Sequence, residues 1–151
     1  MVPIVPVLLA VASVTATPAV TAVTATHDPS ADAAVVKRLV FDVDLDGWVK
    51  ARTSMRRLHP HLDWSTDGCS APVVGSTGRS FNFRSACTRH DFANQNLARL
   101  SMLDAATRAR VDEVFRLDMM STCARKPTSL RIRCLAWSEI FFAAVRAAGK
   151  S

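Results

Sequence analysis

Residues 85–92 read Ser-Ala-Cys-Thr-Arg-His-Asp-Phe, and the rest of the chain is organised around this stretch. Read as an α-helix, it places Cys87, His90 and Asp91 on one face, because residues three and four positions apart are neighbours on a helix surface. The cysteine can anchor the helix to another segment, while the imidazole and the carboxylate are a possible general base and a possible metal ligand. The stretch therefore predicts a helix that carries both a covalent anchor and reactive side chains.

A second cysteine lies upstream, in a run Asp-Gly-Cys that ends at Cys69. If Cys69 is bridged to Cys87, Asp67 is carried towards Asp91, and two carboxylates and a free carbonyl oxygen converge beside an imidazole. Calcium is a hard cation that takes several oxygens of these kinds, so we expect a calcium site here. The alternative is that Asp67 is a solvated turn residue beside an irregular surface loop, residues 70–80, that the disulfide closes.

The four cysteines are typical of two disulfides in a short secreted protein; they are Cys69, Cys87, Cys123 and Cys134. Three pairings are possible, and the spacing favours Cys69–Cys87 and Cys123–Cys134, because each of these closes a modest loop. The rival interpretation is a zinc site made by all four thiolates. It is disfavoured because no two of the cysteines form a close Cys-x-x-Cys pair.

The length and composition indicate one secreted domain. The chain has 151 residues and a net charge of +6, yet residues 1–26 contain no charged residue and no histidine. The apolar run 5–14 has the length of a signal-peptide core and is shorter than the roughly 20 residues that a membrane-spanning helix needs. We expect a signal peptide at 1–25, an N-terminal helical segment at 26–61 and a catalytic core at 62–151. A buried N-terminal strand is the alternative for the first segment.

Capping residues and apolar spacing predict an all-α fold, since strand signals are thin. Asp32 is the expected cap of a first helix. A second short helix is expected near Asp44, with its inward side made by Leu45, Trp48 and Val49. Two antiparallel core helices follow, at about 85–100 and, capped by Asp104, at about 105–120. A last helix is expected at about 129–148.

Two histidines flank a proline, at His59 and His61. Two nearby imidazoles are compatible with a metal site. Pro60, however, is more typical of an extended connection between elements. We therefore interpret both as ordinary surface histidines.

Asp112 shares a helical stripe with the apolar residues Phe115 and Met119. A carboxylate that faces the core is costly unless another group pairs with it. Because the two core helices are antiparallel, Asp112 can approach His90. The neutral imidazole would then take a proton from water, while the carboxylate fixes its tautomer. The alternative is that Asp112 reaches solvent or pairs with an arginine such as Arg108.

Three motifs occur close together in the middle of the chain. They are Asp-Trp-Ser-Thr-Asp-Gly-Cys at 63–69, Phe-Asn-Phe at 81–83 and Cys-Thr-Arg-His-Asp-Phe at 87–92. In combination they resemble the secreted phospholipase A2 family of streptomycetes and filamentous fungi, over about residues 62–145. The chain departs from the family pattern at 93–96, where Ala-Asn-Gln-Asn stands in place of the usual Gly-Tyr-Arg-Asn.

The resemblance implies an α-helical fold with two disulfides and hydrolysis of the sn-2 ester of glycerophospholipids. It also implies that Asp67, Gly68 and Asp91 hold calcium and that His90 and Asp112 are catalytic. Such an oxygen-only ligand set suits calcium better than zinc. A serine lipase is disfavoured, because the chain has no Gly-x-Ser-x-Gly motif.

The positive charge favours a phospholipid membrane or micelle surface as the partner. No nucleic-acid motif accompanies the charge, so we expect no nucleic-acid partner, and we expect a monomer. The alternative from another functional class is a non-catalytic cationic membrane-binding protein on the same scaffold. Such a protein would not need His90 together with Asp112.

Overall fold

The computed structural model describes residues 28–69 and 81–148, and all regular structure within these ranges is helical. In chain order the elements are α1 (Pro29–Lys37), the π-helical turn η1 (Arg38–Asp42), α2 (Leu45–Leu58), α3 (Arg84–Arg99), α4 (Ala105–Ala124) and α5 (Thr128–Ala148). The prediction of an all-α fold is confirmed. The signal peptide predicted at 1–25 and the loop predicted at 70–80 lie outside the described residues.

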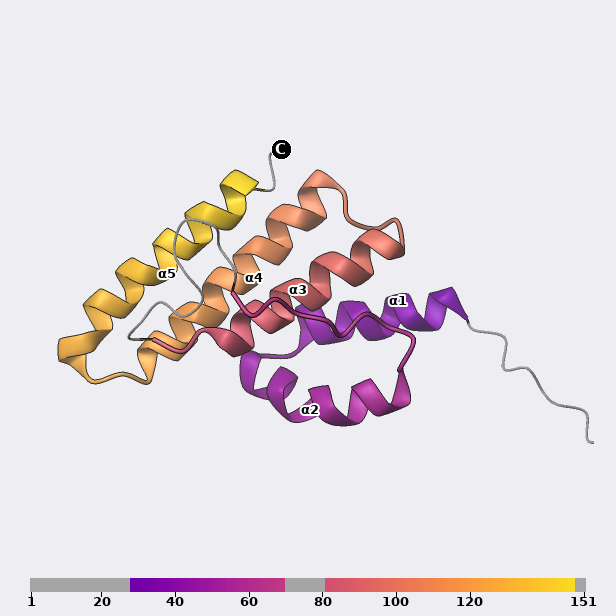
Figure 1. Ribbon diagram of the computed structural model, residues 1–151, viewed down its shortest axis with the longest axis horizontal. Helices are drawn as coiled ribbons and strands as arrows, with labels where there is room; N and C mark the ends of the chain where they lie inside the picture. Colours follow the sequence, from indigo (N-terminus) through magenta and orange to yellow (C-terminus); the bar gives the residue numbers. More distant parts are fainter. Residues whose placement is uncertain (1–27, 70–80, 149–151) are drawn as a thin grey trace, which may run out of the picture.

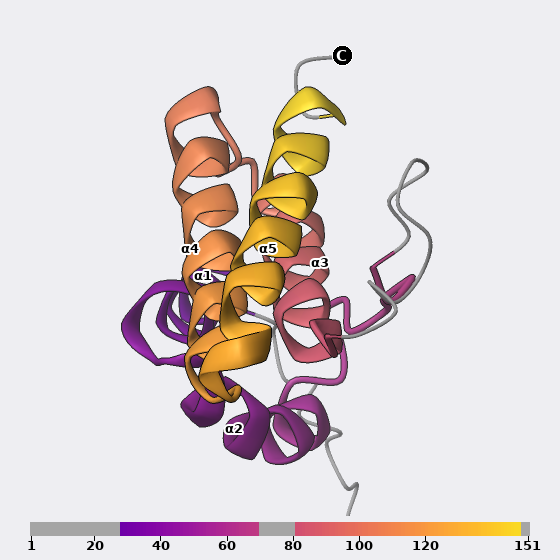
Figure 2. The same cartoon turned by 90° about the vertical axis from the view of Figure 1, so that its left-hand side faces the viewer.

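Helix α4 packs against both α3 and α5, and the three helices run alongside one another (Figure 1). Short connections join them, so neighbouring helices are antiparallel, as predicted for α3 and α4. Asp104 caps α4, as predicted, by accepting a hydrogen bond from the backbone nitrogen of Thr107 at 2.6 Å. Helices α1 and α2 both pack against α3, and α2 lies at the lower end of the three-helix group in Figure 2. Among the described helices, none combines the length and the apolar character needed to cross a bilayer.

The N-terminal helices differ from their predictions in two details. Helix α1 begins earlier than expected, because Asp28 caps it by accepting a hydrogen bond from the Ser30 backbone nitrogen at 2.8 Å. Asp32, the expected cap, instead lies inside the first turn and is only 4% exposed. Asp44 does cap α2, but Val49, expected to face inward, is 48% exposed.

Two apolar clusters form the core. The first joins α1, η1 and α2 to α3 and contains Trp48, which lies 5.0 Å from Phe92 and 6.1 Å from Trp64 between ring centroids. The second lies between α3, α4 and α5 around Phe83, Phe115 and Phe141, with all four cysteines among its members. The N-terminal helical segment and the helix with the His-Asp motif therefore share one core.

The cysteines pair as the spacing favours, Cys69 with Cys87 and Cys123 with Cys134. The first disulfide joins the segment before residue 70 to the second turn of α3, and the second joins α4 to α5. No thiol is free, so a four-thiolate zinc site is excluded. Two disulfides agree with an oxidising extracellular compartment.

Arg89 ties α3 to η1 and to α4. Its side chain is buried and donates hydrogen bonds to three backbone carbonyls, those of Leu39, Val40 and Val43. The last carbonyls of a helical segment lack partners within it, so Arg89 satisfies groups that η1 would otherwise bury unpaired. The same guanidinium donates to both carboxylate oxygens of Asp118, at 3.0 and 3.2 Å.

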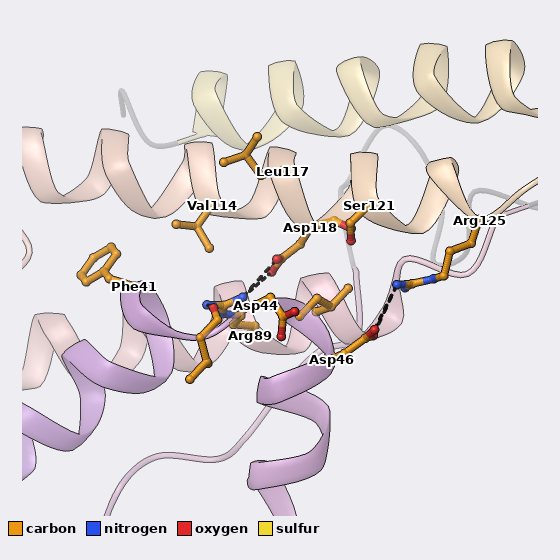
Figure 3. Close-up of a pocket in the computed structure, with 11 residues that line it drawn as sticks. Phe41, Asp44, Asp46, Arg89, Val114, Leu117, Asp118, Ser121 and Arg125 are labelled. Atoms are coloured by element: carbon orange, nitrogen blue, oxygen red, sulfur yellow. Dashed lines mark hydrogen bonds and ion pairs between the residues drawn. The ribbon is translucent and has the colours of Figure 1, made fainter.

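A cavity of about 340 Å³ lies beside this ion pair, between the start of α2 and the middle of α4 (Figure 3). Burial raises the pKa of Asp118 to about 6, although the charge and hydrogen bonds of Arg89 lower it. Further along the cavity, Arg125 and Asp46 form an exposed ion pair at 3.3 Å. The buried Arg89–Asp118 pair therefore borders a pocket that has a second, exposed ion pair at its edge.

Candidate active site

His90 and Asp112 come together across α3 and α4. The Nε2 atom of His90 lies 2.9 Å from Oδ1 of Asp112, and the two side chains are only 14% and 5% exposed. Because a carboxylate can only accept, this hydrogen bond assigns the ring proton to Nε2 and leaves the lone pair on Nδ1. The geometry is that of a base oriented by a carboxylate.

Two further side chains contact this pair, one at the imidazole and one at the carboxylate. The Phe115 ring, one turn beyond Asp112 on α4, packs on the imidazole with 4.8 Å between centroids. A guanidinium nitrogen of Arg146, near the end of α5, lies 3.7 Å from the second oxygen of Asp112. The arginine beside Asp112 among the described residues is thus Arg146 and not the suggested Arg108. Arg146 and Asp112 are 34 positions apart, so no local sequence pattern predicts that they pair.

Asn94 contacts His90 and was missed by sequence reasoning as a site residue. Its amide nitrogen donates to the His90 backbone carbonyl at 3.0 Å and lies 3.2 Å from Nε2 and 3.4 Å from Nδ1 of the ring. The carbonyl contact fixes the amide orientation, because a flipped amide would set two acceptors against each other. The spacing of four positions on one helix was the available signal. Asn94 also stands where the resembling family typically has tyrosine.

The residues predicted to hold calcium lie where the first disulfide joins α3. Gly68 and Cys69 have φ angles of 71° and 80°, so the chain turns through the left-handed region immediately before the bridge. Thr66 donates its hydroxyl to Oδ2 of Asp91 at 2.5 Å and accepts from the Gly68 backbone nitrogen at 3.1 Å. The backbone of Asp67 also donates to Asp91. Thr66 and Asp67 therefore both donate hydrogen bonds to the Asp91 carboxylate.

The electrostatics of this segment suit a cation. Burial is the largest cause that raises the pKa of Asp91, and the negative charge of Asp67 raises it further, against the Thr66 hydrogen bond, which lowers it. Two carboxylates close enough to repel each other are stabilised by a cation between them. With the adjacent Gly68 carbonyl, the set contains only oxygen donors, as calcium requires. The residues present fit a calcium ion.

An amide on α3 holds the extended segment that leads into this turn. Asn96 is 1% exposed; its Oδ1 accepts from the Asp63 backbone nitrogen at 2.8 Å, and its Nδ2 donates to the Asp63 carbonyl at 2.8 Å. Its amide also donates to the carbonyl of Phe92, one turn back. Both backbone groups of one residue are thus paired with a single side chain.

A family model described as prokaryotic phospholipase A2 matches residues 36–149. The chain belongs to the prokaryotic phospholipase A2 family. A secretory phospholipase A2 of Arthroderma benhamiae is 30% identical over 120 residues, which cover 78% of each chain. One of Beauveria bassiana is 29% identical over 123 residues, which cover 82% of this chain and 60% of that protein.

Family membership makes this chain a phospholipase A2 enzyme, as the motifs around His90 predicted. The family match begins at residue 36, within α1, and not near residue 62 where the motif resemblance starts. This agrees with the shared core, because α1 and α2 pack on the helix that carries His90.

A second group of possible metal ligands in this phospholipase A2 contains neither His90 nor Asp112. Asp32, His59 and His61 offer ligand atoms that all lie within 4.8 Å of one another. Both histidines were predicted to be ordinary surface residues, and His59 is partly exposed and His61 exposed. The structure also groups them with a buried aspartate on another helix.

Proposed function

We propose that this protein is a secreted, calcium-dependent phospholipase A2 that hydrolyses the sn-2 ester of glycerophospholipids. His90 is the general base that activates water, and Asp112 orients it. The observation that carries the proposal is the 2.9 Å hydrogen bond between His90 Nε2 and Asp112 Oδ1, made by two largely buried side chains.

The dyad supplies the proton transfer. Water is a poor nucleophile at neutral pH, so a base must remove its proton as it attacks the ester carbonyl. With the ring proton held on Nε2 by Asp112, Nδ1 of His90 is the atom that accepts this proton. Asp112 then stabilises the imidazolium, and the proton is returned to the leaving alkoxide. Phe115 limits the ring to the orientation in which this transfer occurs.

Asp67, Gly68 and Asp91 are the residues that we propose to hold calcium. When bound, the ion would polarise the ester carbonyl and neutralise the phosphate of the substrate. Thr66 supports the site by fixing one oxygen of Asp91, and the Cys69–Cys87 disulfide holds the turn against α3. Both contacts are independent of any ligand and so preorganise the carboxylate.

The enzyme would act at an anionic lipid surface. The chain carries a net charge of +6, and Ile132 on α5 is 76% exposed between the exposed residues Arg131 and Arg133. Basic residues near such a surface contribute about 1 kcal/mol each, and an exposed apolar side chain adds burial in the interface. A non-catalytic membrane-binding protein would share this feature, but it would not need the buried His90–Asp112 pair.

The test is release of fatty acid from vesicles of anionic phospholipid with a label at the sn-2 position. We expect release to require calcium, to stop with chelator, and to be absent when the label is at sn-1. His90→Gln and Asp112→Asn should each lower kcat by about 10²- to 10⁴-fold. Asp46→Asn, which removes only an exposed ion pair, is the matched control. Unchanged kcat in His90→Gln would exclude the dyad mechanism, and release indifferent to chelator would exclude calcium.

A further inference from the structure

Asp32 of α1 lies close to two histidines that follow α2. Asp32 lies in the first turn of α1, while His59 follows the last residue of α2 and His61 lies in the connection beyond it. One ligand atom from each lies within 4.8 Å of the other two. The group shares no residue with the His90–Asp112 pair or with the proposed calcium ligands, and the proposed function does not use it.

The backbone around the histidines is held in place. The His59 nitrogen donates to the Met55 carbonyl at 2.8 Å, which closes the end of α2. The His59 carbonyl accepts from Trp64 Nε1 at 2.8 Å and from the Leu62 nitrogen at 3.2 Å. Pro60 fixes its own φ and restricts the residue before it. The two imidazoles are therefore presented by a short, tied connection.

The ion pair between Asp32 and His61 does not account for the position of the His59 ring beside them. Asp32 is only 4% exposed, and its Oδ1 lies 2.7 Å from Nε2 of His61. The His59 ring is turned edge-on to the His61 ring, at 77° and 5.9 Å between centroids. A buried carboxylate is costly without a partner, and His61 is one partner of Asp32. The His59 ring brings a second imidazole nitrogen to the same place.

We propose that Asp32, His59 and His61 form a zinc site distinct from the calcium site. Two imidazole nitrogens and one carboxylate oxygen suit zinc and its neighbours in the first transition row, whereas calcium and magnesium prefer oxygen alone. Zinc bonds of about 2.0–2.1 Å place tetrahedral ligands about 3.3 Å apart, so the group closes by rotation of the partly exposed imidazoles. Water completes the four-coordinate shell.

The ion would connect α1 to the segment that leads into the calcium turn. His61 is two residues before Asp63, whose backbone Asn96 holds on α3. Zinc at Asp32, His59 and His61 would therefore link the start of α1 to this segment, as the disulfide links its other end. Its effect is on the stability of the fold and not on the reaction itself.

The experiment is a Zn²⁺ titration of the mature protein by calorimetry, in saturating CaCl₂, followed by thermal unfolding. We expect one zinc ion per chain, undisplaced by calcium, and a Tm raised by about 5 °C or more when zinc is at 100 times its Kd. Cobalt in place of zinc should give the visible absorption of a tetrahedral site.

Variants decide where the zinc binds. His59→Gln should weaken zinc binding about 100-fold, because it removes a direct ligand, while leaving the zinc-free Tm nearly unchanged. Its side chain makes no hydrogen bond within the described part of the chain, so misfolding is not expected. Asp32→Asn should also weaken binding, and His90→Gln should bind zinc as the wild type does. Absence of a one-to-one zinc complex overturns the proposal. Binding kept by His59→Gln and lost in His90→Gln would overturn it too, by placing the ion at the catalytic pair. The outcome of the zinc titration is independent of whether fatty-acid release requires calcium, so the two proposals can fail separately.

Discussion

Replacing the buried Asp118 with asparagine should change how the stability of the fold depends on pH. Burial raises the pKa of Asp118 from 3.8 to about 6, despite the facing guanidinium of Arg89. The folded protein therefore binds a proton at Asp118 more tightly than the unfolded chain does. Stability contributed by the protonated form is present below about pH 4 and is lost as pH rises towards 6.

The magnitude follows from the same pKa. The pKa of Asp118 rises by about two units on folding. At about 1.4 kcal/mol per pKa unit, the full effect on the free energy of unfolding is about 3 kcal/mol. Asparagine imitates the neutral carboxyl in shape and cannot ionise. Since the unfolded carboxyl is already about half ionised at pH 4, the wild type should lose about 2.5 kcal/mol relative to Asp118→Asn between pH 4 and pH 7.

Urea unfolding of both proteins at pH 4, 5, 6 and 7 measures this difference. Comparing the two proteins removes the contribution of other carboxyl groups, including those of Asp63 and Asp104, whose pKa values are lowered by hydrogen bonds from Ser65 and Thr107. Asp46→Asn, at an exposed ion pair, should show no such pH-dependent difference. If the wild type instead gains on the variant as pH rises, the Arg89 ion pair outweighs burial and the reasoning is refuted.

Three other perturbations have defined outcomes. Replacing Cys123 and Cys134 together with serine should cost about 3 kcal/mol, by the chain-entropy relation for their sequence separation of 11, as measured by urea unfolding; no loss would contradict it. Thr66→Val keeps the side-chain shape but removes the hydrogen bond to Asp91, so calcium affinity by titration should fall about 10-fold; equal affinity would exclude a supporting role. Arg146→Gln should lower kcat for lipid hydrolysis by about 2- to 5-fold with little change in KM, since it removes the cation beside the dyad carboxylate; a KM effect alone would indicate substrate binding instead.

The helices were predictable because their signals are local. Asp44 and Asp104 are followed by apolar residues at helical spacing, and each caps a helix as expected. The inward position of Asp112 was predictable for the same reason, since it lies on the stripe of Phe115 and Met119, and all three are buried. Antiparallel packing then follows from the short connection between α3 and α4.

The contacts that could not be predicted join residues far apart in sequence. Arg89 bonds to carbonyls about fifty positions upstream, and a backbone carbonyl carries no residue-specific signal. Asp32 has the sequence context of a helix cap, but tertiary packing places it against His61, 29 positions away. Arg146 is one of 19 basic residues, and nothing near it in sequence distinguishes it from the others.

The double hydrogen bond from Asn96 to Asp63 has a consequence for how a helical fold can place a loop. A carboxamide offers one donor and one acceptor side by side, the same pair that a neighbouring β-strand would offer to an extended residue. One side chain on a helix thus makes the two backbone hydrogen bonds that a strand residue would make, and so sets the position of Asp63 before the turn at Gly68. The amide at position 96 fixes the backbone of residue 63, and the buried side chains of Leu62 and Trp64 on either side then enter the core. An all-helical protein can thus position a loop without a sheet.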